Sequence, residues 1–287
     1  MKNKKHTTLL VLLIALASII ASSTGIFLDE GPGQFEIESV RGEKITIFGK
    51  GLYQHMSDDV AIQGIAQDYI TLFLGVPLLL ISLFLSRKNS FRGLFLLAGT
   101  LGYFLVTYLF YLTMGMYNQM FLVYAFLLGT TFFAFILTVL EFDLNELKNR
   151  FNSEKLVRNA GFFLIINATM VGLLWLGVVL PPIFDGTIYP KELQHYTTLI
   201  VQGFDLGLLL PIAFVVGYLA IKKNKYGFLF APIYMIFLSL LMTALVSKIL
   251  FMANTGQNVM PVIFIMPTIV LISISFSILL LKNIKKS

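Results

Sequence analysis

The chain has 287 residues, of which 57% are hydrophobic and 13% charged, and it contains no cysteine. Soluble domains are about 45–50% apolar and about 25% charged, so this composition excludes a soluble globular protein. The absence of cysteine excludes disulfides, thiolate metal sites and cysteine nucleophiles. The formal net charge of +6 does not predict a nucleic-acid partner, because the basic residues flank the apolar segments, as expected at a lipid bilayer.

Apolar segments long enough to cross a hydrocarbon core of about 30 Å recur along the whole chain. They predict an all-α integral membrane protein in which residues 1–287 form one polytopic membrane domain. Eight transmembrane helices are expected at 8–28, 64–86, 92–114, 118–140, 159–180, 200–221, 227–251 and 259–281. The first segment also resembles a signal peptide, with a basic start and small residues near its end. We interpret it as a retained helix because its apolar stretch continues through Leu28.

The basic residues are distributed unevenly between the two sides of the predicted bundle. One side, which includes both termini, receives 16 lysines and arginines, whereas the other receives four. Cytoplasmic segments carry the excess of basic residues, so both termini are expected in the cytoplasm. The 141–158 segment is then a cytoplasmic connection, and its pattern, with Glu146 and Arg150 four residues apart, predicts a solvated surface helix.

Residues 29–63 form the largest predicted extracytoplasmic segment. The stretch "FEIESVRGEKITIFGKGLY" places residues that favour strands on both sides of a glycine-containing turn, which predicts a short β-hairpin. The alternative is an irregular loop.

The second and sixth predicted helices share a spacing that suggests an internal repeat. Pro77 and Pro211 are 134 residues apart, and the same offset relates Lys88 to Lys222 and Gly93 to Gly227. Both helices run inward, so the repeat is parallel, with four helices in each half, as in several transporter folds. The alternative is a chance likeness between two proline-containing membrane helices.

Three charged residues lie inside predicted spans. An aspartate at the centre of a membrane helix costs about 2.5–3.5 kcal/mol on insertion scales, so each needs a reason. Asp68 lies at the outer start of its predicted helix, whereas Asp205 lies about six residues into its own, about 9 Å deep. Lys248 lies at a similar depth on the next helix, and we predict that it forms an ion pair with Asp205.

Other polar residues gather toward the same extracytoplasmic half. Thr71 shares a helix face with Asp68, Gln202 shares one with Asp205, and Tyr103 lies on one stripe with Thr107 and Tyr111. The predicted ligand-binding residues are Asp68, Thr71, Tyr103, Asn118, Gln202, Asp205 and Lys248. Their alternative role is structural, as interface residues and hydrogen-bond partners between helices.

The sequence identifies no cofactor and no catalytic residue. His55 and His195 in the outer loops are weak candidates for metal ligands, but no spacing typical of a metal site connects them to other ligands. No phosphate-binding glycine loop or nucleophile elbow is present. The sequence therefore favours a protein that is not an enzyme, without excluding a membrane-embedded one that uses Asp205 as a base.

The strings "VRGEKITIFGKGLY", "AQDYITLFLGVPLLL", "YNQMFLVYAFLLG" and "VQGFDLGLLLP" resemble those of a group of bacterial multi-pass membrane proteins with no established activity. The resemblance covers nearly the whole chain and implies a bacterial plasma membrane and eight spans. Those proteins carry a lysine nearer the middle of the seventh helix, where this chain has "PIYMIFLSLL", so no shared role for Lys248 follows.

Two classes of function fit these features. The first is binding or transport of a small solute through a polar cavity on the extracytoplasmic side, between the two halves. The second is a non-transporting accessory or sensor subunit with a membrane protein partner. A membrane-embedded enzyme is the third alternative. The lipid bilayer is the one partner common to all three.

Overall fold

The computed structural model describes residues 4–114 and 116–285. Within them, eight helical segments are long and apolar enough to cross a membrane, which confirms the prediction of an all-α multi-pass membrane protein. The elements are α1 Lys4–Phe27, β1 Phe35–Glu38, β2 Lys44–Ile47, α2 Asp58–Ile70, α3 Val76–Arg87, α4 Phe91–Met114, α5 Phe121–Val139, α6 Glu154–Val179, α7 Pro181–Asp185, α8 Ile200–Phe204, α9 Leu210–Ile221, α10 Lys225–Asn254 and α11 Val262–Asn283.

The connection at 141–158 differs from the predicted surface helix. It contains a short 3₁₀ helix, Leu147–Arg150, and then turns extended at Phe151 before α6 begins at Glu154. Phe151 forms an isolated β-bridge with Ile284 near the C-terminus, and this pairing competes with helix formation. The predicted contact between Glu146 and Arg150 is present, at 3.2 Å.

The second and sixth spans are each interrupted by a π-helical turn before their proline. These turns cover Thr71–Gly75, between α2 and α3, and Asp205–Leu209, between α8 and α9. In each turn a backbone N–H bonds to the carbonyl five residues back, from Val76 to Thr71 and from Leu210 to Asp205. A proline cannot donate a backbone hydrogen bond, and the wider turn accommodates this loss within a continuous span.

The 134-residue offset extends to backbone details of these two spans. The π turns begin at Thr71 and Asp205, and the spans end at Arg87 and Ile221. The turns that follow contain two residues with positive φ, Asn89 at 60° and Lys223 at 55°. All three pairs are 134 positions apart.

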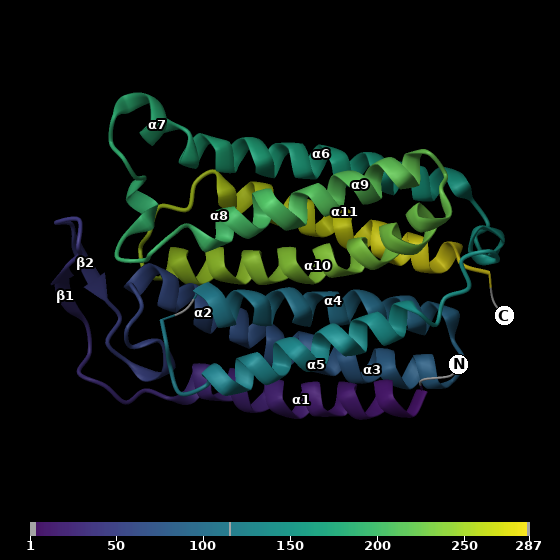
Figure 1. Cartoon of the computed structure of the whole chain (residues 1–287), viewed down its shortest axis with the longest axis horizontal. Coiled ribbons are helices and arrows are strands. Elements are labelled where there is room, and N and C mark those ends of the chain that lie inside the picture. The colour runs from purple at the N-terminus through teal and green to yellow at the C-terminus, as the bar shows by residue number, and fades with distance from the viewer. Residues whose placement is uncertain (1–3, 115, 286–287) are drawn as a thin grey trace.

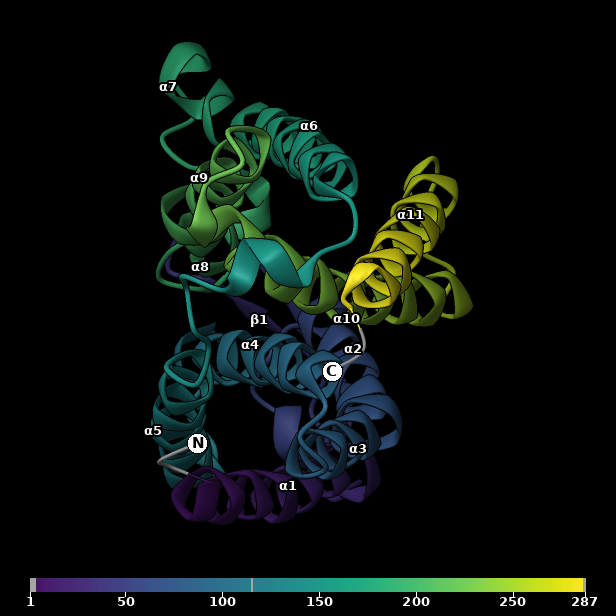
Figure 2. The same ribbon diagram turned by 90° about the vertical axis from the view of Figure 1, so that its right-hand side faces the viewer.

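Seen along the bundle, the helices form two groups, which we call the N-terminal and C-terminal groups (Figure 2). The N-terminal group contains α1 to α5 and the C-terminal group contains α6 to α11. Helices α4 and α10 contact each other between the groups. There Gly99 lies so close to α10 that a Cβ atom on it would be 2.5 Å from Ile236 Cβ and 2.9 Å from the Ile233 carbonyl oxygen.

The two groups close differently. In the N-terminal group α1 packs along α5, whereas in the C-terminal group α6 and α11 contact each other at few positions. Instead, α6 packs closely on α9 through Gly161 and Gly217. Small residues of this kind allow membrane helices to approach closely.

Both termini lie at one end of the bundle, and the strands and α7 lie at the other (Figure 1). We call these the terminal end and the hairpin end. At the hairpin end β1 pairs antiparallel with β2, in a register that joins Phe35 to Ile47. In the turn between them, the Arg41 guanidinium donates to the backbone carbonyls of Gln194 and Tyr196, at 3.0 and 3.1 Å. These bonds connect the N-terminal group to the 186–199 loop of the C-terminal group.

A second arginine connects the groups at the terminal end. Arg92, at the start of α4, donates to the carbonyl of Ile284 at 2.6 Å. The backbone N–H of Lys285 donates to the carbonyl of Arg150 at 2.8 Å. The last described residues are therefore held between α4 and the connection that precedes α6.

Candidate functional site

Asp68 is the centre of a buried polar cluster in the N-terminal group. The helix that carries it begins at Asp58, so Asp68 lies ten residues, or about 15 Å, from the hairpin end of that helix. Its side chain is almost fully buried, with 3% exposure. The expectation that Asp68 lies at the outer start of its helix is wrong, because α2 begins six residues earlier than predicted.

Two tyrosines donate hydrogen bonds to the Asp68 carboxylate. Tyr53 Oη lies 2.5 Å from Oδ2, and Tyr111 Oη lies 2.9 Å from Oδ1. Space for this arrangement comes from two glycines. A Cβ atom at Gly25 would overlap the Asp68 carboxylate, and one at Gly64 would lie 3.1 Å from the Tyr53 ring.

A second network lies next to the first and joins Gln67 of α2 and Thr71 of the π turn to Tyr103 of α4. Gln67 Nε2 donates to Tyr103 Oη at 2.8 Å, and Thr71 Oγ1 donates to the carbonyl of Gln67 at 2.9 Å. The Thr71 proton is thus in use, so the Tyr103 hydroxyl donates to Thr71 Oγ1, 2.9 Å away. The structure thus brings together Asp68, Thr71 and Tyr103 from the predicted set.

Three buried hydroxyls near this cluster form no hydrogen bond of regular geometry within the described residues. They belong to Ser18 and Ser22 on α1 and to Tyr108 on α4. Ser22 interacts with the Asp68 carboxylate and Ser18 with the Tyr108 hydroxyl, at looser geometry than a regular hydrogen bond. Buried hydroxyls in proteins are nearly always paired, so this interior offers unused donors and acceptors.

A cavity of about 140 Å³ adjoins the cluster at the hairpin end. It is lined by Tyr111, Tyr124 and Asn118, together with Leu112, Met116, Tyr117 and Phe121. The rings of Tyr111 and Tyr124 stack with centroids 5.2 Å apart. Tyr111 therefore contacts Asp68 through its hydroxyl and the cavity through its ring, and Asn118 from the predicted set lies at the cavity wall.

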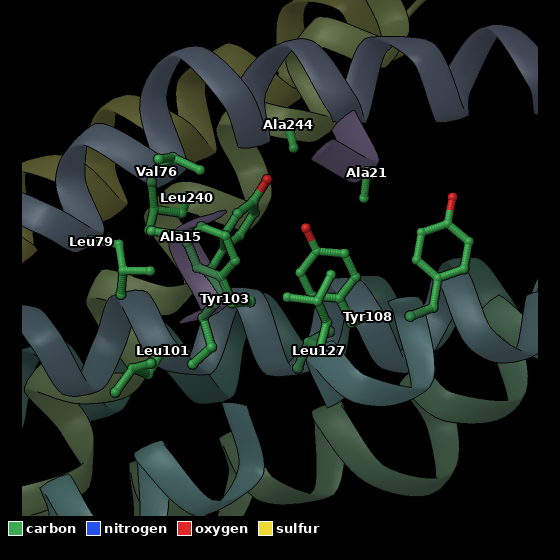
Figure 3. Close-up of a cluster of buried hydrophobic side chains, with 14 of the residues drawn as sticks. Ala15, Ala21, Val76, Leu79, Leu101, Tyr103, Tyr108, Leu127, Leu240 and Ala244 are labelled. Carbon is green, nitrogen blue, oxygen red and sulfur yellow. The ribbon is translucent and has the colours of Figure 1, made fainter. Parts of the chain in front are cut away.

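Apolar side chains close the cluster toward the terminal end. Val11, Ile14, Leu79, Leu101 and Ala134 are fully buried and belong to one hydrophobic cluster. Figure 3 shows Leu79 and Leu101 beside Tyr103. The cavity therefore lies on the hairpin side of the cluster, and packed apolar side chains lie on its terminal side.

Asp205, Gln202 and Lys248 do not join this cluster. Asp205 accepts a hydrogen bond from Trp175 Nε1 on α6, at 2.7 Å. Within the described residues no ion pair joins Asp205 to Lys248, so the predicted direct contact is wrong. Lys248, half-buried on α10, attracts both Asp205 and Asp68 electrostatically. Gln202, half-buried on α8, lies 134 positions after Asp68.

Residues that the sequence did not indicate complete the site. Tyr53 lies on a short 3₁₀ helix, Gly51–Tyr53, in the segment between α1 and α2, and no periodic pattern marks it. Ser18 and Ser22 are four residues apart on α1 and share a face. That spacing could have indicated a polar face on α1. Serines are common in membrane helices, so the spacing alone does not single out these two.

The two weak metal candidates are neighbours without forming a metal site. His195 Nε2 lies 3.2 Å from the backbone carbonyl of His55, not from its ring. Among the described residues no group of three His, Cys, Asp or Glu side chains could hold a metal ion.

His195 makes the 186–199 loop sensitive to acid. Burial lowers the pKa of His195 below its ordinary value of 6.5, and its Nδ1 is buried without a partner. The detached loop binds a proton more readily than the docked loop, so docking should weaken as pH falls below about 6.5 and stay constant above it. Hydrogen exchange of residues 186–199, corrected for intrinsic rates, should be faster at pH 5.5 than at pH 7.5. The same difference in H195Q would show that another group is responsible.

Tyr103→Phe is expected to lower the free energy of unfolding by about 1–3 kcal/mol. The substitution removes the acceptor of Gln67 Nε2, whose remaining contact, to Thr107, is 3.4 Å long. Chemical denaturation in detergent would measure the change. Tyr117→Phe is the matched control, since Tyr117 is exposed, and it should leave the stability unchanged.

Comparisons with known proteins identify no relative: no family model, curated protein or solved structure matches the chain. The resemblance to the bacterial membrane proteins therefore stays a prediction.

Proposed function

We propose that this multi-pass membrane protein binds a small polar solute at Asp68, inside the N-terminal group, as part of solute recognition or transport. One observation carries the proposal. A buried carboxylate lies beside hydroxyls that lack regular hydrogen bonds, and its partner Tyr111 lines a cavity at the hairpin end. This location replaces the predicted cavity between the two halves, because Asp205 accepts its hydrogen bond from Trp175 on α6 rather than from the Asp68 cluster.

The energetics favour a bound polar molecule over an empty structural cluster. A buried polar group without a partner costs about 1–3 kcal/mol, and Ser18, Ser22 and Tyr108 near the site make only loose contacts that recover part of this cost. A solute or ordered water molecules that supply donors and acceptors would remove this cost. A solute would reach the cluster from the hairpin end, because the adjoining cavity lies there.

In the proposed topology, the hairpin end of the bundle lies on the extracytoplasmic side of a bacterial plasma membrane. The excess of basic residues at the terminal end supports cytoplasmic termini. The hairpin of β1 and β2 then lies outside.

We also propose that the two groups are a parallel repeat of four helices each. The 134-residue offset of π turns, helix ends and positive-φ residues supports it. Gly99 against the carbonyl of Ile233 supports it independently, since these positions are also 134 apart and would meet at the pseudo-twofold axis. The repeat makes Gln202 the counterpart of Asp68, so a carboxylate at this point belongs to the N-terminal group alone.

A second candidate function is that of a subunit in a membrane complex. Helices α6 and α11 leave large apolar faces exposed, including Phe162, Leu173, Phe264 and Leu271. Their counterparts α1 and α5 pack against each other. A partner helix could occupy this more open side of the C-terminal group.

Native mass spectrometry of the gently solubilised full chain tests the proposed function. We expect a small molecule to co-purify with the protein, to be lost from Asp68→Asn and to be retained by Asp205→Asn, the matched control. Loss from both variants, or retention by both, would contradict a site at Asp68. A co-purifying protein chain without a small molecule would support the subunit instead.

A further inference from the structure

We infer that the solute bound at Asp68 is a small organic cation whose ammonium N–H groups contact the Asp68 carboxylate and the Ser22 hydroxyl beside it. This inference rests on the proposed function and adds the chemical class of the ligand.

The first argument is the charge of the site. Asp68 forms no ion pair within the described residues, and its two hydrogen bonds come from neutral tyrosines. A carboxylate has about four acceptor positions, so each oxygen can accept a further donor. An ammonium group supplies both donors and the opposite charge, which makes its hydrogen bonds about twice as strong as neutral ones. An anionic solute would instead be repelled.

The second argument is the ring of aromatic side chains. Tyr53 and Tyr111 stack with centroids 6.5 Å apart, Tyr111 and Tyr124 at 5.2 Å, and Tyr108 and Tyr124 at 6.2 Å. Tyrosine faces attract cations through their quadrupole, by about 0.5–2 kcal/mol depending on desolvation. Two of these rings, those of Tyr111 and Tyr124, line the cavity, so a cation in the cavity contacts aromatic walls next to Asp68.

The third argument is the charge at the hairpin end of the bundle, where the cavity lies. Residues 29–59 and 185–199 contain nine aspartates and glutamates against four lysines and arginines, a formal net charge of −5. The remaining connections at the hairpin end, 115–120 and 255–261, carry no charged side chain. The basic-residue rule of membrane topology concerns lysine and arginine and does not require this surplus of acids. A negative surface around an opening raises the local concentration of cations.

Lys248 acts against the proposed ligand. Its ammonium group attracts Asp68 from α10, outside the ring of tyrosines, and it would repel a second cation there. Lys248→Met should therefore strengthen cation binding, by about two- to tenfold. For an anionic solute the same substitution should weaken binding, so Lys248 distinguishes the two charge classes.

The test uses the full chain in phosphatidylcholine nanodiscs and ligand-observed saturation-transfer NMR. The probes are propylammonium, tetramethylammonium, 1-propanol and propionate, which share a size and differ in charge and donors. We expect propylammonium to bind and tetramethylammonium, which has no N–H donor, to bind more weakly. Neither 1-propanol nor propionate should bind. Asp68→Asn should weaken the binding of propylammonium by about 10- to 100-fold, whereas Asp205→Asn should leave its binding unchanged.

Tyr124→Leu provides a second variant if Asp68→Asn does not fold. It keeps an apolar side chain in place and removes an aromatic face, so propylammonium should bind about three- to tenfold more weakly. If 1-propanol or propionate bound in a way that depends on Asp68, the inference of a cationic ligand would be wrong. The proposed solute site at Asp68 would still stand. Binding of neither cation would also overturn the inference. The co-purification experiment then decides separately whether any solute occupies the site.

Discussion

Replacing Asp68 with leucine is expected to lower the free energy of unfolding by about 2 kcal/mol. The substitution removes the acceptor of Tyr53 and one of two acceptors of Tyr111, whose hydroxyl also lies 3.0 Å from the Gly64 carbonyl oxygen. A stranded buried hydroxyl costs about 1–3 kcal/mol. Removal of a buried charge offsets part of this loss. Denaturation in detergent, followed by tryptophan fluorescence, would measure the difference, because Trp175 is the only tryptophan in the sequence and lies on α6, outside the cluster.

Asp68→Asn is the companion variant, because its amide keeps one acceptor oxygen. It should lie between the wild type and Asp68→Leu in stability. If Asp68→Leu were more stable than the wild type, the carboxylate would cost more than its hydrogen bonds contribute. Retention of such a costly group would then itself indicate a functional role rather than a structural one.

Gly99→Leu should have the largest effect on the contact between the two helix groups, with an expected loss of about 3 kcal/mol. A Cβ atom there would lie 2.5 Å from Ile236 Cβ and 2.9 Å from a backbone oxygen of α10, so whole helices have to separate. Denaturation under the same conditions would measure the loss.

Gly129→Leu is the matched control for this substitution. A Cβ atom on Gly129, in α5, would meet nothing within 4 Å, and replacing glycine within a helix removes a cost of about 1 kcal/mol. Gly129→Leu should therefore be neutral or stabilising. Equal losses from both variants would mean that leucine is destabilising in any helix of this protein, and that the contact between α4 and α10 is not specific.

The transmembrane helices were predictable because their signal is long and redundant. A span needs about 20 apolar residues, so the loss of a few positions does not hide it. The ends were less predictable where polar residues continue a helix beyond the apolar stretch. Asp58 and Asp59 begin α2 in this way, and the resulting shift of six residues led to the wrong depth for Asp68.

The site was only partly predictable, because its members come together through tertiary contacts. Asp68 and Thr71 share a helix face, which the sequence reveals. Tyr53 reaches Asp68 from a 3₁₀ helix in the outer segment, and nothing in the spacing predicts that approach. Asp205 and Lys248 failed as a pair for the opposite reason. The two residues lie at similar depth on sequential helices, but their side chains do not meet. Trp175 donates the hydrogen bond to the Asp205 carboxylate instead.

The two arginines at opposite ends of the bundle restrict how this molecule can move. Arg41 fastens the groups at the hairpin end and Arg92 fastens them at the terminal end. In a rocker-switch motion, one half of the protein pivots against the other. Each such pivot would have to break the hydrogen bonds of Arg41 or those of Arg92. Each hydrogen bond of a charged group contributes about 1.5–3 kcal/mol. A solute held within α1 to α5 would travel with its own group during such a pivot and gain no exit from it. Release toward the terminal end would instead require those helices to part from one another.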